Sequence, residues 1–212
     1  MVTHPADRHL EIEAKLWVEA LPPVLAKLAQ AGAEMRHPRI FERNIRYEDA
    51  SGSLTPAGVV LRLRQDDRAR LTYKGPALVP ATTGLQTRFE AEVTVDDFDT
   101  MALILERLGY RPFMVYEKYR TTYVLDETEI VLDEMPYGLF VEIEGAPDRI
   151  EAVIDRLGLA DAPRFGESYA QLFERVKHRL GLTFTDLTFE NFSGIRVPLE
   201  AFLPEEKAEN HG

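Results

Sequence analysis

The chain has 212 residues, of which 45% are hydrophobic, which is enough for one large domain with a buried core. Its 36 Asp and Glu residues outnumber its 25 Lys and Arg residues and give a net charge of −11, which argues against a general nucleic-acid or anionic-membrane surface. Because cysteine is absent, disulfide scaffolds, zinc–thiolate sites and cysteine nucleophiles are excluded, and any metal would be held by oxygen or imidazole ligands.

The sequence also shows no pattern typical of a membrane-spanning segment or a signal peptide. No apolar run reaches the length of a transmembrane helix, and Met1–Arg8 lacks the apolar stretch of a signal peptide. We therefore expect a cytoplasmic monomer or homodimer that takes a small-molecule partner and binds neither nucleic acid nor membrane.

Strand and helix patterns alternate along the first half of the chain. Polar–apolar alternation predicts a strand at His9–Trp17. Apolar spacing of three and four predicts a helix at Leu21–Ala31, which ends at Gly32. Asp97–Leu108 is predicted as a second helix, with Asp96 as its cap. Between the two helices the pattern predicts four strands, near Ile40–Asp49, Gly58–Gln65, Ala69–Gly75 and Gln86–Val95.

The second half of the chain also contains both strand and helix patterns, which end near Leu180. It predicts three more strands and two more helices, near Pro112–Val124, Glu129–Met135, Leu139–Gly145, Pro147–Gly158 and Glu167–Leu180. Leu182–Leu203 is expected to pack as a strap on the outside of the main domain, and Pro204–Gly212 reads as a frayed tail. The predicted organisation is therefore a domain at 1–181, a strap at 182–203 and a disordered tail at 204–212.

The polar face of these strands is fully ionic, and like charges recur two residues apart. Two such charges lie roughly 7 Å apart. Their repulsion is about 0.6 kcal/mol in water and about 2.4 kcal/mol at an effective dielectric constant near 20. The cost is small on an open surface, but a concave site would need counter-charges. The charges that share strand faces are Glu11, Glu13 and Lys15; Arg62 and Arg64; Lys74; Arg88, Glu90 and Glu92; Lys118 and Arg120; Asp133; and Glu142 and Glu144.

Eight strands can close into a small barrel, which would turn this ionic face inward and the apolar face toward the helices. We therefore predict an α+β fold, a closed eight-stranded, mainly antiparallel β-barrel that forms a tunnel with a charged lumen surrounded by helices. A lumen with about as many acids as bases suits a metal-bound phosphate chain. Carboxylate ligands favour Mg²⁺ or Mn²⁺.

The N-terminal motif Glu11-Ile12-Glu13-Ala14-Lys15 resembles the ExExK signature of the CYTH superfamily, the triphosphate tunnel metalloenzymes. This family takes its name from class IV adenylyl cyclase and thiamine triphosphatase. Further segments resemble the family's later motifs in the family's order, from about residue 9 to 180: Asn44–Asp49, Gly58–Arg64, Leu71–Gly75, Arg88–Glu92, Lys118–Arg120, Leu132–Glu134, Phe140–Gly145 and Ser168-Tyr169.

The resemblance implies a tunnel that binds a linear triphosphate, and it implies a role for each charged position. Glu11, Glu13, Glu142 and Glu144 would hold Mg²⁺ or Mn²⁺, with Asp133 nearby. Glu90 and Glu92 would serve a second metal or orient water, and Lys15 would assist them in catalysis. The residues that would bind phosphate oxygens are Lys15, Arg62, Arg64, Lys74, Arg88, Lys118 and Arg120.

Three functions share this site. Attack of water on the terminal phosphorus would make the protein a triphosphatase, which we favour because water needs no base recognition. Attack of a ribose 3′-hydroxyl on the α-phosphorus of ATP would make it a class IV adenylyl cyclase that releases pyrophosphate. A non-catalytic polyphosphate-binding module is the third alternative.

Overall fold

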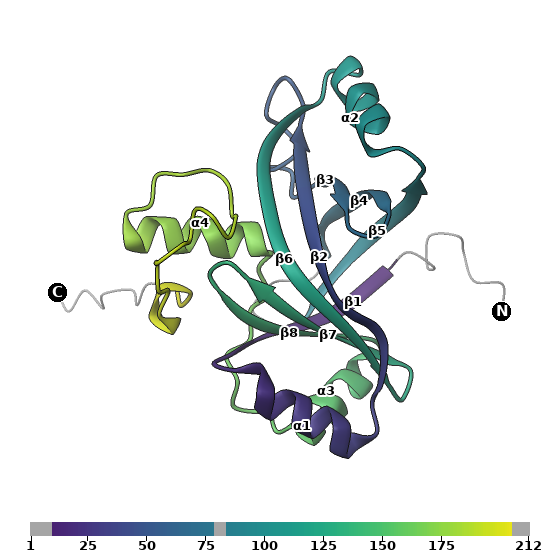
Figure 1. Cartoon of the computed structure of the whole chain (residues 1–212), viewed down its shortest axis with the longest axis vertical. Helices are drawn as coiled ribbons and strands as arrows, with labels where there is room; N and C mark the ends of the chain where they lie inside the picture. Colours follow the sequence, from purple (N-terminus) through teal and green to yellow (C-terminus); the bar gives the residue numbers. More distant parts are fainter. Residues whose placement is uncertain (1–9, 79–83, 205–212) are drawn as a thin grey trace.

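The structure is a computed structural model that describes residues 10–78 and 84–204. Within these residues it contains eight strands and four helices, and Figure 1 shows the helices on the outside of the strands. The strands are β1 (Leu10–Val18), β2 (Glu34–Glu48), β3 (Val60–Gln65), β4 (Ala69–Ala77), β5 (Gln86–Val95), β6 (Arg111–Leu125), β7 (Thr128–Met135) and β8 (Gly138–Glu144). The helices are α1 (Leu21–Ala31), α2 (Phe98–Arg107), α3 (Pro147–Leu157) and α4 (Tyr169–Leu180).

The eight strands hydrogen-bond in a ring, in the order β1-β5-β4-β3-β2-β6-β7-β8, and β8 returns to β1. Every neighbouring pair in the ring is antiparallel. The predicted eight-stranded antiparallel sheet and its α+β class are therefore confirmed. Because the ring has no free edge, each strand has one face inside it and one face outside.

Most element boundaries agree with the sequence prediction within two residues, and two of the differences have a local physical cause. Strand β2 begins at Glu34, six residues before the predicted start at Ile40. Its first residues are exposed on both faces, and register shifts around His37 accommodate Pro38, which cannot donate a ladder hydrogen bond. This stretch therefore lacks the alternation that identifies a strand. Helix α2 is capped by Asp97, not by the predicted Asp96, because the Asp97 carboxylate accepts from the Thr100 N–H at 2.6 Å.

The outside of the ring is covered by helices in three patches of apolar core. Helices α1 and α3 lie side by side over β1, β7 and β8, where Leu28 and Ile154 pack with Leu16. Helix α4 places Phe173 against the part of the ring that carries Phe140. Helix α2 packs at the far end of the long β2 and β6 strands (Figure 1). Apolar side chains therefore fill the outer layer and leave the inner face to the charged residues.

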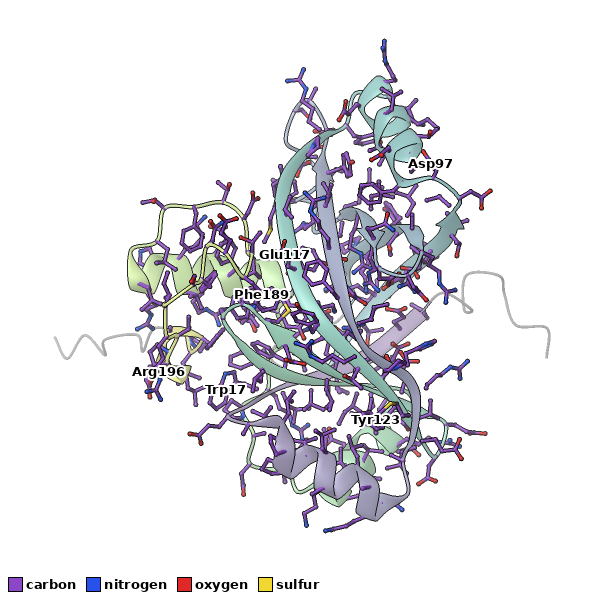
Figure 2. The ribbon with its side chains drawn as sticks, viewed as in Figure 1. Trp17, Asp97, Glu117, Tyr123, Phe189 and Arg196 are labelled. Atoms are coloured by element: carbon purple, nitrogen blue, oxygen red, sulfur yellow. The ribbon has the colours of Figure 1, made fainter. Side chains whose placement is uncertain are left out.

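The segment after α4 follows the outer side of β6. The Leu187 N–H donates to the Val115 carbonyl at 2.9 Å, and the Leu187 carbonyl accepts from the Glu117 N–H at 3.0 Å. The Glu117 carboxylate accepts from the Phe189 N–H at 3.0 Å, and Figure 2 shows these two residues next to each other. Phe202 is fully buried in the same core patch as α4. The predicted tail at 204–212 lies outside the described residues, apart from Pro204.

Helix α4 begins with a capping box that fixes how its first residues approach the ring. Ser168 accepts from the Gln171 N–H, and the Gln171 side chain accepts from the Ser168 N–H at 2.9 Å. We expect Ser168→Ala to lower the free energy of unfolding by about 1 kcal/mol, measured by urea denaturation. Ser193→Ala, at an exposed position, is the matched control and should change it by less than about 0.5 kcal/mol. Equal effects of the two variants would contradict the capping role.

No helix among residues 10–78 and 84–204 has the length and apolar character that crossing a membrane requires.

Candidate functional site

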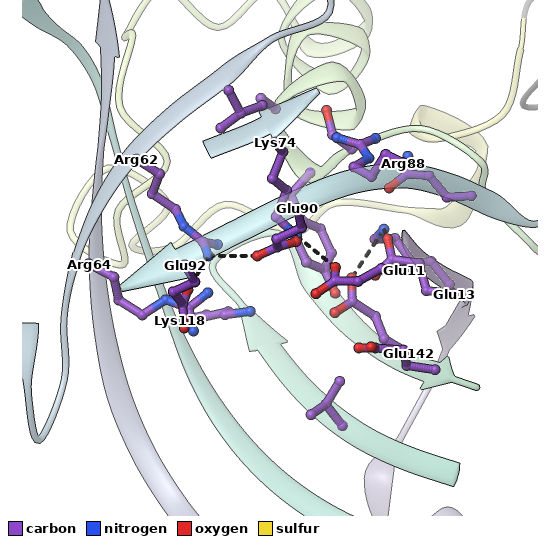
Figure 3. A pocket seen from close by; sticks show the side chains of 18 of the residues that line it. Glu11, Glu13, Arg62, Arg64, Lys74, Arg88, Glu90, Glu92, Lys118 and Glu142 are labelled. Atoms are coloured by element: carbon purple, nitrogen blue, oxygen red, sulfur yellow. Dashed lines mark hydrogen bonds and ion pairs between the residues drawn. The ribbon is translucent and has the colours of Figure 1, made fainter. Parts of the chain in front are cut away.

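Alternation along the strands turns the charged side chains toward the inside of the ring, while their apolar neighbours pack under the helices. The inward side chains enclose a cavity of about 250 Å³, and Figure 3 shows the side chains of lining residues around it, among them Glu11, Arg62 and Glu142. Of the site residues predicted from sequence, only Asp133 does not line this cavity. The lining includes Glu11, Glu13, Lys15, Arg62, Arg64, Lys74, Arg88, Glu90, Glu92, Lys118, Arg120, Glu142 and Glu144.

The charge of the lining is opposite to that of the whole chain. Nine Lys and Arg side chains line the cavity against seven Glu side chains, although the chain carries a net charge of −11. Such an enclosed excess of positive charge, surrounded by low-dielectric walls, attracts and concentrates anions.

Arg62 on β3 is a basic lining residue that is held by partners from three other strands. It donates to the hydroxyls of Tyr116 and Thr72, at 3.1 and 3.0 Å. It also lies 3.4 Å from Glu92 and 3.8 Å from Glu90. Burial by itself lowers the pKa of Arg62, but these partners outweigh it and raise the pKa above its usual value. Arg62 is therefore charged and held with its guanidinium facing the cavity.

Glu42 on β2 is a buried counter-charge behind the basic lining. Arg64 donates to Asn44 at 3.0 Å and to Glu42 at 3.3 Å, and the Lys118 ammonium lies 3.6 Å from the second oxygen of Glu42. Burial raises the pKa of Glu42, but Lys118 and Arg64 outweigh burial and hold it well below the usual range. Glu42 therefore stays ionised and fixes these two bases.

Asp133 on β7 is fully buried and anchors two other bases. It accepts from Lys118 at 2.9 Å, and from Arg120 at 2.7 Å to one oxygen and 2.5 Å to the other. The Tyr169 hydroxyl of α4 donates to it at 2.9 Å. The structure surrounds Asp133 with cations and a hydroxyl behind the lining, and its predicted place near a metal stays a prediction.

Three carboxylates form a row across neighbouring strands. Glu13 on β1 faces Glu144 on β8, which in turn faces Glu129 on β7. Burial, followed by the charges of Glu129 and Glu13, raises the pKa of Glu144 to about 7. At one end of the row, Lys15 lies 3.3 Å from Glu13 and 3.1 Å from Glu142. Like charges directly opposite each other destabilise a sheet, so this row favours a proton or a cation.

A hydrogen bond joins the carboxyl groups of Glu11 on β1 and Glu90 on β5. Burial and the hydrogen bond with Glu90 raise the pKa of Glu11 to about 9. Burial also raises the pKa of Glu90, but the hydrogen bond from Glu11 and the charge of Lys74 outweigh it and lower the pKa to about 2. The Lys74 ammonium lies 3.5 Å from Glu11 and pairs with Glu90.

These raised pKa values predict how the stability of the protein depends on pH without added metal. Glu144 keeps its proton to about pH 7 when folded but loses it near pH 4.5 when unfolded. Because the folded state then binds more protons, stability falls as pH rises between these values. We expect the melting temperature in EDTA to fall from pH 5 to pH 8, and Glu144→Gln to make this fall shallower. Parallel curves for the two proteins would contradict the protonation of Glu144.

The donors in the cavity fit a hard divalent cation. They are carboxylate oxygens, which Mg²⁺ and Mn²⁺ prefer. Among the described residues, no three acidic or histidine side chains converge tightly enough to surround an ion by themselves. Mg²⁺ usually takes one or two carboxylates together with water and substrate phosphate oxygens. The crowding of Glu13, Glu144 and Glu129 therefore fits an ion whose coordination a phosphate ligand completes.

The structure adds lining residues that the sequence analysis did not identify. They are Arg46, Arg70, Gln86, Tyr116, Glu129 and Tyr169. Glu42, Asn44 and Arg46 point inward at every second position of β2, but exposed Arg43 on the outer face hides this alternation. Tyr116 is an aromatic residue that sequence patterns assign to a core, and Tyr169 belongs to the Ser168-Tyr169 motif, to which the sequence analysis gave no role. The approach of both to the charged residues depends on the tertiary structure.

Comparison with known proteins identifies the family. A model of the CYTH domain matches residues 9–159. A Methanocaldococcus jannaschii protein provisionally named an adenylate cyclase is 27% identical over 137 residues, which are 64% of this chain and 76% of that protein.

Solved structures share the fold. A Pyrococcus horikoshii protein is 26% identical, with a TM-score of 0.62 over 77% of this chain and 98% of that one. A provisionally named adenylate cyclase of Vibrio parahaemolyticus has a TM-score of 0.70 at 22% identity, over 78% of this chain and 98% of that one. A Hippeastrum protein provisionally named an adenylyl cyclase, with dominant triphosphatase activity, has a TM-score of 0.56 at 19% identity, over 82% and 97%. With its family motif, its ring of strands and its charged interior, this chain belongs to the CYTH domain family.

Proposed function

We propose that the protein is a divalent-metal-dependent hydrolase that cleaves the terminal phosphoanhydride bond of a linear triphosphate inside the ring, which acts as a tunnel. The observation that carries the proposal is the enclosed cavity, where nine bases face seven acids in an otherwise acidic chain. Its volume of about 250 Å³ lies just below the range of about 300–1,000 Å³ that holds drug-sized ligands, so it suits a compact anion. Inorganic triphosphate or the phosphate chain of an organic triphosphate has this character.

Phosphoryl transfer requires mainly positioning and charge neutralisation, and the lining residues supply both. The phosphate oxygens would be bound by Lys15, Arg62, Arg64, Lys74, Arg88, Lys118 and Arg120. Glu42 and Asp133 hold three of these bases, Arg64, Lys118 and Arg120, from behind, so the bases need little rearrangement when substrate enters.

Carboxylates on β1 and β8 would hold Mg²⁺ or Mn²⁺ together with phosphate oxygens. The ligands would be Glu11, Glu13, Glu142 and Glu144, and the ion would supply further charge neutralisation. Glu129, the third member of the carboxylate row, lies next to them.

Water attack needs a group that accepts a proton. Burial raises the pKa of Glu92 on β5, but the hydrogen bond from Thr72 and the charge of Arg62 outweigh burial and hold the pKa below its usual value. Glu92 is therefore ionised. It lies beside Arg62 at the cavity wall. We assign Glu92 as the acceptor of the proton from the attacking water, with the Glu11–Glu90 pair as its neighbour. The water oxygen bonds to the terminal phosphorus, the bridging P–O bond breaks, and orthophosphate and a diphosphate leave.

An adenylyl cyclase activity is the second candidate. A neighbouring cavity of about 550 Å³ shares Arg64, Arg70, Arg120 and Glu129 with the first one, so it offers room for a nucleoside beside the phosphate chain. The names of the archaeal and Vibrio relatives also favour this reading.

Product identification separates these functions. Purified protein would be incubated with inorganic triphosphate, ATP and thiamine triphosphate, each with Mg²⁺, with Mn²⁺ or with EDTA. Metal-dependent orthophosphate release is the expected result. Cyclic AMP with pyrophosphate would establish the cyclase instead. Binding without turnover of any of the three would leave a polyphosphate-binding module and contradict both enzymatic readings.

A further inference from the structure

A group of apolar side chains on the outer face of β1, β5 and β4 is open to solvent. Tyr73 on β4 is 43% exposed and Val93 on β5 is 56% exposed. Leu10, at the start of β1, and Leu78, which follows β4, are exposed as well. Single exposed apolar side chains are ordinary on protein surfaces, whereas a contiguous apolar patch marks an interaction site.

The strand pairing makes these side chains neighbours. Val93 lies opposite Leu71 and Tyr73 lies opposite Ala91, and residues that face each other across a pair of strands share one face of the sheet. The Tyr73 ring packs edge-on against Phe89, with the ring centroids 6.2 Å apart. Strand β1 continues the surface, because its first residue lies opposite Phe89. We call this surface the β4–β5 strip, and it consists of Leu10, Leu71, Tyr73, Phe89, Ala91 and Val93.

The helices leave most of the strip uncovered. Helices α1 and α3 pack over β1, β7 and β8, and α4 packs against the part of the ring that carries Phe140. Helix α2 reaches only one end of β4 and β5, at Leu71 and Val95. Among residues 10–78 and 84–204, no helix lies over the middle of these two strands, as Figure 1 shows. An antiparallel sheet face that is exposed to water is normally polar, so this apolar face lacks a partner.

The strip is also uncharged, although the chain as a whole carries a net charge of −11. The charged residues of these stretches, Lys74, Glu90 and Glu92, line the cavity inside the ring, so the outer positions between them are neutral. Two copies of such an acidic chain repel each other over most of their surfaces, and least where two neutral faces meet. The net charge disfavours an anionic lipid surface, and a basic partner would gain no electrostatic attraction from a neutral strip.

We propose that two copies of the chain form a symmetric dimer by packing their β4–β5 strips face to face. A two-fold interface uses the same patch on both subunits, so the patch must complement itself. A neutral, apolar sheet face meets this requirement, since two sheets pack face to face with their strand directions about 30° apart. Tyr73 would be a central anchor, because aromatic side chains are enriched at the centres of interfaces. This inference is independent of the proposed function.

The size of the strip determines how strong the dimer can be. Three strands about 4.8 Å apart, with five residues each rising about 3.3 Å, span roughly 14 by 16 Å. Standard interfaces bury about 800 Å² per partner, so the strip would form the centre of the interface and the surrounding residues its rim. We therefore expect a dimer Kd in the micromolar range. Added salt should tighten the dimer, because it screens the repulsion between two acidic chains.

Sedimentation velocity over a range of protein concentrations would measure the dimer Kd of the wild type, of Val93→Glu and of Met35→Glu. Met35 is 57% exposed, as much as Val93, but it lies on the β2–β6 pair on the opposite side of the ring, so it is a matched control. We expect Val93→Glu to weaken the dimer at least tenfold, because it places a carboxylate in a dehydrated interface, and Met35→Glu less than twofold. A wild-type protein that stays monomeric up to about 200 µM would overturn the inference, as would equal Kd values for wild type and Val93→Glu.

Cross-linking tests the same face with a smaller change of side chain. Because the chain has no cysteine, Val93→Cys and Met35→Cys each introduce a single thiol. A bismaleimide should join two copies of Val93→Cys and should leave Met35→Cys monomeric on a denaturing gel. Cross-linking of Met35→Cys alone would place the interface on another face and overturn the inference.

Vesicle sedimentation tests the competing occupant of the strip. We expect no binding of the wild-type protein to phosphatidylcholine vesicles or to vesicles that also contain phosphatidylglycerol. Binding that Val93→Glu abolishes and Met35→Glu retains would assign the strip to a membrane surface and overturn the dimer.

Discussion

Asp133→Asn is expected to lower the free energy of unfolding by about 3–5 kcal/mol, the usual cost of removing one partner from a buried ion pair. Asp133 is fully buried and accepts from Lys118, Arg120 and Tyr169. An asparagine there cannot accept all of these hydrogen bonds, and its amide would direct a donor at a cation. The other buried counter-charge near Lys118, Glu42, also pairs with Arg64 and cannot replace it.

Urea denaturation of the purified protein would measure this loss. Asp161→Asn is the matched control, because it makes the same chemical change at an exposed residue and should alter stability by less than about 0.5 kcal/mol. A loss below 1 kcal/mol for Asp133→Asn would show that Lys118 and Arg120 do not depend on Asp133. In that case we would reject its role as their anchor.

Arg62→Gln should reduce the kcat for hydrolysis of inorganic triphosphate by about 10²–10³-fold, the range found when one group that stabilises transition-state charge is removed. Arg62 contacts four side chains from three strands, which fix its guanidinium toward the cavity. Glutamine retains one donor but neither the charge nor the fork that matches phosphate oxygens. The loss should appear mainly in kcat if Arg62 binds the transition state more strongly than the substrate.

Steady-state orthophosphate release with Mg²⁺ present would measure the effect. Arg111→Gln, which removes the same charge from an exposed position at the start of β6, should keep kcat within a factor of two. A circular dichroism spectrum and melting temperature close to wild type would show that Arg62→Gln remains folded. Near-normal turnover by the folded variant would exclude Arg62 from the phosphate site.

Local pattern was sufficient for much of the fold. Alternation in Leu10–Val18 and the Pro22 and Gly32 boundaries around α1 are short-range signals, and the elements formed where these signals placed them. The first part of β2 was not predicted, because it is exposed on both faces and its pairing with β6 is interrupted by register shifts. Such a segment is a strand only because a partner strand is present.

Some residues of the candidate site were likewise predictable from local sequence patterns, and others were not. Most of its charged residues were predicted, since like charges at alternate positions place them on one face of a strand. Glu42 and Arg46 were not, because Arg43 on the opposite face of β2 is also charged and conceals the pattern. Glu129 was missed because its neighbours in the carboxylate row, Glu13 and Glu144, come from other strands.

The sequence by itself determined which side chains share a strand face, because the two-residue period of a strand is a property of the local backbone. It thereby determined the family motif and the ionic character of the inner face. Only the tertiary structure decided which of these charges are neutralised by partners and which are not. That outcome depends on distances of a few ångströms between residues tens of positions apart, such as Arg62 and Glu92, and on the burial that makes an uncompensated charge costly.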